Sequence, residues 1–211
     1  MQQVILIFFG WVLGVFSSMI LENRKRKQTK EDYEGILFTE LDLVYPEIVG
    51  IYYKITKGTG QLNKENLEWM HNIISKKNSE SLDTIDDAII KLLKYDDKEM
   101  KLLNEKHHNS HTLAIMKLNL SFLKENISLF SLLDKEVRFS AINIRTNINY
   151  LNDIIDEVNY FYRTSFVPGV TEGAYNSANS NIKKCYIIIR DLCKSTSEMI
   201  VSINEKRKKI Y

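Results

Sequence analysis

Three of the four histidines fall within one short stretch, HHNSH, which begins at residue 107. His107 and His111 are four residues apart, so on a helix they share one face at a spacing that can chelate a metal ion. The same stretch contains Glu105-x-x-His108, and Glu68-x-x-His71 supplies a second copy of that pattern. Paired Glu-x-x-His motifs hold the metals of di-iron helical bundles. The candidate metal ligands are therefore Glu68, His71, Glu105, His107, His108 and His111.

The elements that would have to position these ligands argue against a metal site. A di-iron site needs both motifs to point into one bundle core, together with a glutamate from each of two further helices. In the helix expected around residues 64–76, Leu67, Met70 and Ile74 form the inward face, which leaves Glu68 toward its edge. The stretch from 104 to 111 interrupts the apolar spacing. We therefore expect a solvated helix junction there, with no metal and no cofactor.

Other catalytic patterns are absent from the sequence. There is no G-x-S-x-G nucleophile elbow and no H-E-x-x-H zinc motif. Cys185 and Cys193 are eight residues apart on one expected helix, about 12 Å along its axis, which is too far for a disulfide. We expect both to be reduced. These observations favour a protein that is not an enzyme, with a metal-dependent bundle enzyme as the least favoured alternative.

The composition predicts an all-α chain. Only two prolines and eight glycines interrupt 211 residues, and 44% of the chain is hydrophobic. The net charge of +2 conceals a division, because five basic residues lie between positions 22 and 30. Removing those five and Glu22 leaves 24 basic and 26 acidic residues from position 31 onward, or about −2. A main domain with this balance is not expected to bind nucleic acid.

The N-terminal segment has the composition of a membrane anchor. Residues 4–21 are continuously apolar or small, and at about 1.5 Å per residue they would span about 27 Å. The basic residues follow the apolar run, whereas a cleaved signal peptide has them before it. We therefore expect an uncleaved anchor over residues 1–22, a basic juxtamembrane segment over 23–30, and a cytoplasmic helical domain over 31–211. The expected localisation is the inner or plasma membrane, single-pass, with the N-terminus outside.

Two sets of residues are predicted to act at the membrane. Gly10, Gly14 and Ser18 recur every four residues, a small-residue ridge that can pack against a second copy of the span. The basic residues next to the span are expected to contact anionic headgroups; they are Arg24, Lys25, Arg26, Lys27 and Lys30. The C-terminal residues 205–209, EKRKK, would also lie near headgroups if the last helix returns toward the membrane.

Apolar residues at alternating steps of three and four predict long helices with coiled-coil-like seams. We expect such helices over residues 113–130, 137–162 and 178–203. Together with the helix that follows the anchor they would form an elongated up-down four-helix bundle. Pro46 is expected to kink or end the post-anchor helix, and KGTG at 57–60 to form a loop. Residues 112–165 could be one helix or two, and we expect a break with Asp134 capping the second.

The aromatic run from residue 160 to 166 lies at an expected helix end. It either closes the base of the bundle or forms a docking patch made of Tyr160, Phe161, Tyr162 and Phe166. The leading hypothesis is a membrane-tethered, non-enzymatic interaction or signalling module with a protein partner or a second copy of itself. The alternative is a membrane-perturbing effector, of toxin or anti-phage type, that oligomerises through its anchor.

Overall fold

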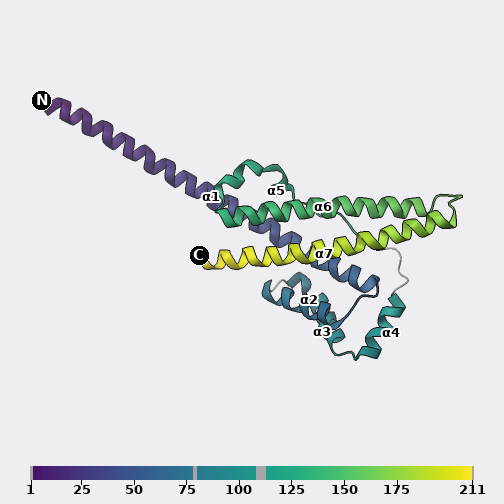
Figure 1. Ribbon diagram of the computed structural model, residues 1–211. Helices are drawn as coiled ribbons and strands as arrows, with labels where there is room; N and C mark the ends of the chain where they lie inside the picture. Colours follow the sequence, from purple (N-terminus) through teal and green to yellow (C-terminus); the bar gives the residue numbers. More distant parts are fainter. Residues whose placement is uncertain (1, 78–79, 108–112, 211) are drawn as a thin grey trace.

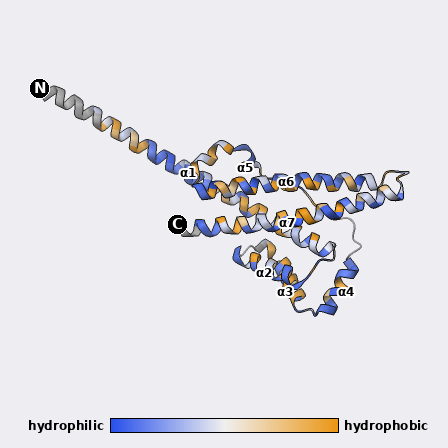
Figure 2. Cartoon of the chain, in the orientation of Figure 1, coloured by the Kyte–Doolittle hydropathy of each residue, from blue (hydrophilic) through white to orange (hydrophobic). Residues whose placement is uncertain are grey.

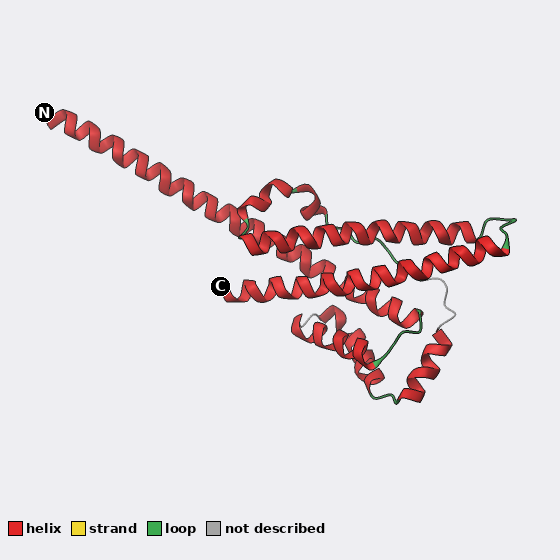
Figure 3. Ribbon diagram, in the orientation of Figure 1, coloured by secondary structure: helices red, strands yellow, loops and turns green. Residues whose placement is uncertain are grey.

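The chain is all-helical in the computed structural model, which describes residues 2–77, 80–107 and 113–210 (Figures 1 and 3). Within those ranges the side chains of residues 2–10, 12, 80 and 208–210 are not described. The described part contains no strand. The elements are α1 (Gln2–Gly58), α2 (Lys64–Lys77), η1 (Glu80–Leu82), α3 (Asp83–Leu93), α4 (Asp97–His107), α5 (Ser121–Glu125), η2 (Ile127–Leu132), α6 (Lys135–Ser165) and α7 (Glu172–Ile210). The all-α expectation is confirmed for these residues.

Helix α1 is one element of 57 residues, about 85 Å long. Of the kink or helix end expected at Pro46, the helix end is wrong, because α1 continues to Gly58. Tyr45, Ile48 and Val49 around the proline are fully buried, so their packing holds the helical path where the local sequence would break it. The helix ends in a Schellman motif: Gly60 has φ +66°, and the amide of Gln61 donates to the carbonyl of Thr56 at 2.9 Å. The loop expected at KGTG is confirmed only for Thr59 and Gly60, because Lys57 and Gly58 are the last residues of α1.

The anchor expected at the start of α1 is corrected by the structure. Of the helices whose residues are described, none carries an apolar stretch long enough to cross a bilayer. This finding contradicts the transmembrane anchor, the single-pass topology and the inner- or plasma-membrane localisation. Gly10 and its ridge position lie outside the described side chains.

The expected boundaries near residues 22 and 30 coincide with no change of secondary structure, because α1 passes through both. The basic segment instead makes contacts within the protein. Lys30 donates to Asp134 at 2.7 Å, and Lys27 lies 3.8 Å from Glu31. At the other end of the chain, Lys206 contacts Glu136 at 2.8 Å. These contacts join the basic residues to α1 and to the start of α6.

The core is built from α1, α6 and α7. Helices α6 and α7 form a long antiparallel hairpin, and α1 packs along α7 (Figure 1). The direction of that packing is antiparallel, since Arg190 of α7 contacts Gln61 while Arg207 lies over the ring of Phe38, 4.7 Å from its centroid. We use "inner half" for the part of the hairpin beside α1, residues 135–150 and 190–207. "Distal half" denotes residues 151–165 and 172–188, which extend past the end of α1.

The seams of α6 and α7 follow the sequence expectation closely. The spacing of apolar residues is visible as alternating orange and blue along both helices (Figure 2). In α6 the apolar residues at alternating steps of three and four are buried up to residue 158, and Tyr162 is exposed; the buried ones are Val137, Ala141, Ile144, Ile148, Leu151, Ile155 and Val158. In α7 the buried seam positions are Ala178, Ile182, Cys185, Ile189, Thr196 and Ile203. Both cysteines are free and buried, as expected.

The fourth bundle helix, expected over residues 113–130, does not form. Residues 113–120 have no regular structure, and only the short α5 and η2 follow. Asn152 of α6 holds this segment by pairing with both the amide and the carbonyl of Leu118, each at 2.8 Å. This pairing satisfies backbone groups that a helix would have satisfied internally. Met116, an expected seam residue, is 84% exposed. We call residues 113–120 the strap.

A break before α6 is confirmed, since that helix starts at Lys135. The cap is different from the one expected, because the Asp134 side chain makes no capping hydrogen bond and binds Lys30 instead. The capping of α5 comes from α1: Glu40 accepts from the amides of Phe122 and Leu123 at 2.7 and 2.9 Å. A contact remote in sequence thus replaces the local cap.

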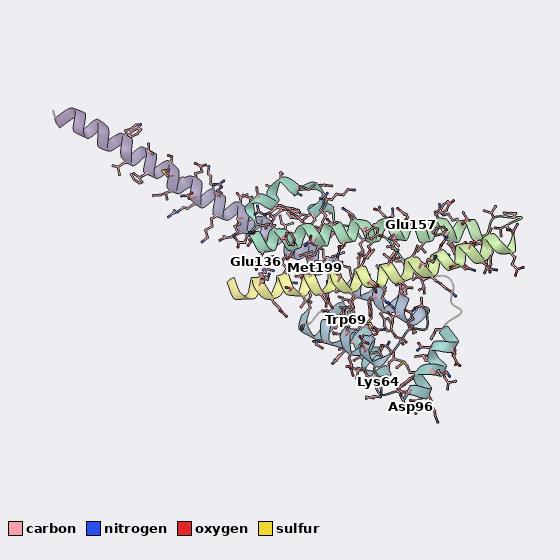
Figure 4. The ribbon with its side chains drawn as sticks, in the orientation of Figure 1. Lys64, Trp69, Asp96, Glu136, Glu157 and Met199 are labelled. Atoms are coloured by element: carbon pink, nitrogen blue, oxygen red, sulfur yellow. The ribbon has the colours of Figure 1, made fainter. Side chains whose placement is uncertain are left out.

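Helices α2, α3 and α4 form a smaller layer beside α7. Trp69 of α2, which is labelled in Figure 4, donates its indole N–H to Glu198 of α7 at 2.9 Å. Its ring contacts that of Tyr52 of α1, with the two planes tilted by 46°. Local side chains cap the starts of two of these helices. Asn63 accepts from the amide of Asn66 at 2.8 Å, and Asp96 with Glu99 forms a reciprocal capping box at 2.8–2.9 Å.

Candidate functional site at the tip of the α6–α7 hairpin

The hairpin tip, residues 160–175, lies at the end of the molecule opposite the N-terminal arm of α1 (Figure 1). The turn is set by local sequence. Helix α6 ends at Ser165, Pro168 cannot continue it, and Gly169 adopts φ +84°, a conformation that favours glycine. Thr171 then accepts from the amide of Ala174 at 3.3 Å at the start of α7. The turn therefore holds the two helix ends in a defined geometry.

Aromatic and aliphatic side chains cover the tip. Tyr160 is 63% exposed and Phe166 is 64% exposed, while Tyr162 is exposed to a lesser extent. The rings of Tyr162 and Phe166 meet edge to face, with centroids 4.8 Å apart and planes at 62°. This pair fixes two of the exposed rings against each other. The tip thus presents preorganised apolar surface to solvent.

Phe161 differs from its neighbours in the aromatic run. It is half-buried and packs against the core, and its ring also contacts that of Tyr160 at 5.5 Å between centroids. The sequence hypothesis left open whether the run closes the bundle or forms a docking patch. In the structure Phe161 does the first, whereas Tyr160, Tyr162 and Phe166 face solvent.

The tip carries almost no charge. Between residues 160 and 175 the only ionisable side chains with full charge at neutral pH are Arg163 and Glu172, which cancel. Sequence reasoning missed three further exposed apolar residues there, Val167, Val170 and Tyr175. Their signal was the VPGV turn, which places apolar residues where turns are normally polar. Charge depletion together with exposed aromatics is the composition of the buried centre of a protein interface.

The candidate metal ligands are not brought together. His71 contacts Asp86 at 2.8 Å, while Glu68 and Glu105 are exposed. His107 ends α4, and His108 and His111 lie outside the described residues. Across the described residues, no three His, Cys, Asp or Glu side chains form a group that could hold a metal ion. The described members of the two Glu-x-x-His motifs, Glu68, His71 and Glu105, therefore do not form a metal-binding group.

The remaining predicted residues lie on the exposed arm of α1. Gly14 has no atom within 4 Å of the position a β-carbon would take, and Ser18 hydrogen-bonds its own helix at the carbonyl of Val15. Arg24, Lys25 and Arg26 are exposed. The arm thus lies apart from the hairpin tip, with the body of the protein between them (Figure 1).

Comparison with known proteins finds no similar protein. No protein-family model, no curated protein and no solved structure matches this chain.

Proposed function

We propose that this chain is a non-enzymatic helical interaction module that binds a protein partner at the tip of its α6–α7 hairpin. The observation that supports the proposal is the exposure of Tyr160 and of the Tyr162–Phe166 ring pair at a protruding and nearly uncharged end of the molecule. Exposed apolar surface gathered at one end of a domain marks interaction sites in soluble proteins.

The rings suit this role for a physical reason. Tyrosine and phenylalanine bury large areas while losing the freedom of only two side-chain torsions, so they contribute strongly to interface hot spots. Because Tyr162 and Phe166 already contact each other, little further ordering is needed on binding. The long hairpin holds this surface away from the rest of the protein, where a partner can reach it from several directions.

Photo-crosslinking in the native cell tests the proposal. A benzophenone amino acid at position 160 should form one discrete adduct, which mass spectrometry then identifies. The matched control is position 139, because Phe139 lies on the same helix and is 67% exposed but belongs to the inner half. An adduct of twice the chain's mass would identify a second copy as the partner.

The identified partner then permits a quantitative test. Purified with the full chain, it should bind at least tenfold more weakly to Phe166→Ser, because truncating one interface hot spot costs about 2 kcal/mol or more. Phe139→Ser should leave the affinity unchanged. Identical adducts from positions 160 and 139, or equal affinities of the two variants, would refute the proposal.

A further inference from the structure

A groove of about 740 Å³ lies between α1 and the strap, away from the hairpin tip. Its volume falls in the range of about 300–1,000 Å³ that is usual for small-molecule sites. The lining is mostly apolar, and its apolar residues include Ile51 and Tyr53 of α1, Ile85 of α3, and Leu113, Ile115 and Leu118 of the strap; His107 of α4 also lines the groove. The apolar lining would accommodate an alkyl chain.

Polar contacts hold the strap wall of the groove in place. Tyr186 of α7 accepts from the amide of Leu113 at 3.2 Å, and Asn152 holds Leu118 by the paired hydrogen bonds described above. Leu118 is buried, and so is Ile115, which lies between these two attachments. The wall is therefore fixed at both ends, so the groove exists before any ligand arrives.

Glycine keeps the α1 side of the groove open. Gly50 lines it, and a β-carbon built there would have only one neighbour within 4 Å, the Cδ1 of Ile85 at 3.9 Å. A larger side chain at this position would have room at its first carbon and would then extend into the groove. The absence of a side chain at residue 50 thus contributes directly to the free volume.

The charged residues of the groove favour an anion. Lys54 and Lys57 are three residues apart on α1 and so lie on one face, while Glu47 is the acidic residue among the lining side chains. Lys54 donates to the carbonyl of Ala114 at 3.2 Å, which uses one of its three N–H groups. Lys117 also lines the groove but pairs with Asp156. Lys54 and Lys57 are therefore the cations that can meet a ligand.

We propose that this groove binds an amphipathic anion, a medium-chain monocarboxylate, with its alkyl chain along Ile51, Ile85 and Ile115 and its carboxylate at Lys54 and Lys57. An uncharged apolar molecule would contact the apolar lining but form no ion pair with Lys54 or Lys57. An amphipathic cation would place its charge against them. The order of affinity for one chain length is therefore anion, then alcohol, then cation.

Isothermal titration of the full chain with decanoate, decanol and decyltrimethylammonium tests this order. Decanoate should bind saturably with one molecule per chain, decanol at least fivefold more weakly, and the cation without detectable saturation. The double variant Lys54→Gln/Lys57→Gln should weaken decanoate at least tenfold and leave decanol unchanged. Its control is Lys91→Gln/Lys94→Gln, the same spacing on exposed lysines at the end of α3, which should leave both affinities unaltered.

A blocking variant separates the groove from other apolar surface, including the exposed arm of α1. Gly50→Leu should abolish decanoate binding while raising the melting temperature, because leucine is a better helix former than glycine. The control is Gly35→Leu, because Gly35 lies on the same helix and has no atom within 4 Å of its β-carbon position. This variant should also have a raised melting temperature, but it should bind decanoate as wild type does. Equal decanoate affinity in wild type and Gly50→Leu, or equal affinity for decanoate and decanol, would overturn the proposal. Partner docking at the tip should be the same in all of these variants.

Discussion

The inner and distal halves of the α6–α7 hairpin share one seam pattern but have different surroundings. In the inner half α1 packs along α7, and buried residues there include Ile200 and Ile203, both fully inaccessible. The distal half extends past the end of α1 and has mainly the strap beside it, through Asn152 and Tyr186. The same helical periodicity therefore produces a three-helix core at one end and an exposed tip at the other. Exposure of the tip follows from where α1 ends.

The largest difference between the halves is expected from matched cavity substitutions in α7. Ile200→Ala should lower the free energy of unfolding by about 2–5 kcal/mol, toward the upper end, because the tightly packed inner half cannot collapse into the cavity. Ile182→Ala, in the distal half, should fall near the lower end. Urea denaturation measures both losses. Both variants replace isoleucine with alanine, so the gain in helix propensity is the same in each and does not affect the difference between them. Equal losses would mean that the halves are packed alike.

A smaller loss is expected when the strap is released from the distal half. Asn152→Leu removes both hydrogen bonds to Leu118 and leaves a buried amide and carbonyl without partners, which should cost about 1–3 kcal/mol. The control is Asn149→Leu, an exposed position on the same helix, which should cost less than about 0.5 kcal/mol. Amide hydrogen exchange at Leu118 should also accelerate in the first variant. Unchanged exchange there would show that the strap is held by apolar contacts alone.

Alkaline pH should weaken the attachment of α5 and η2 to α1. Burial, and then repulsion by Glu40, raises the pKa of Tyr33 from 10.0 to about 12. The folded state therefore favours the neutral phenol, which donates to the carbonyl of Asn126 at 3.2 Å. This contribution to stability is complete below pH 10, the pKa of an unfolded tyrosine, and is lost as pH rises through about 12. Tyr33→Phe should lose less stability than wild type across that interval in urea titrations, and an identical loss would contradict the assignment.

The smallest effect on stability is expected at the tip itself. Phe166→Ser should change the free energy of unfolding by less than about 0.5 kcal/mol, because a 64% exposed side chain far from the core has little packing to lose. The same variant is the one expected to weaken partner binding most. A loss above about 1 kcal/mol in urea denaturation would mean that the tip is structural, which would remove the contrast between the two halves.

Part of this architecture follows from local sequence and part does not. The α6 and α7 seams, the Asn63 cap, the Asp96–Glu99 capping box and the Gly60 helix end could be predicted, because each depends on residues within one or two turns. The strap could not, since Leu113, Met116 and Leu120 have helical spacing but lie in a segment without regular structure. The backbone of the strap is held by the Asn152 side chain, more than thirty residues away in the sequence. The spacing of apolar residues within a segment cannot indicate a hydrogen-bond partner at that distance.

The candidate site shows the same division. The aromatic run and the VPGV turn indicated a patch at a helix end, but whether those rings would close a bundle or face solvent depended on how far α1 reaches. The paired Glu-x-x-His motifs had suitable spacing, yet their helices do not direct them into one core among the described residues. The N-terminal anchor was inferred from composition and is contradicted by the described helices.

The sequence by itself determined the helical periods, the caps and turns, and the near absence of charge at residues 160–175, because these depend on side-chain type and short-range backbone geometry. Only the tertiary structure decided which apolar faces are covered, since burial depends on contacts between residues far apart in the chain. Because α1 ends partway along the hairpin, the inner half is buried and the tip is exposed. The pairing of Asn152 with the strap holds one wall of the groove that Lys54 and Lys57 line.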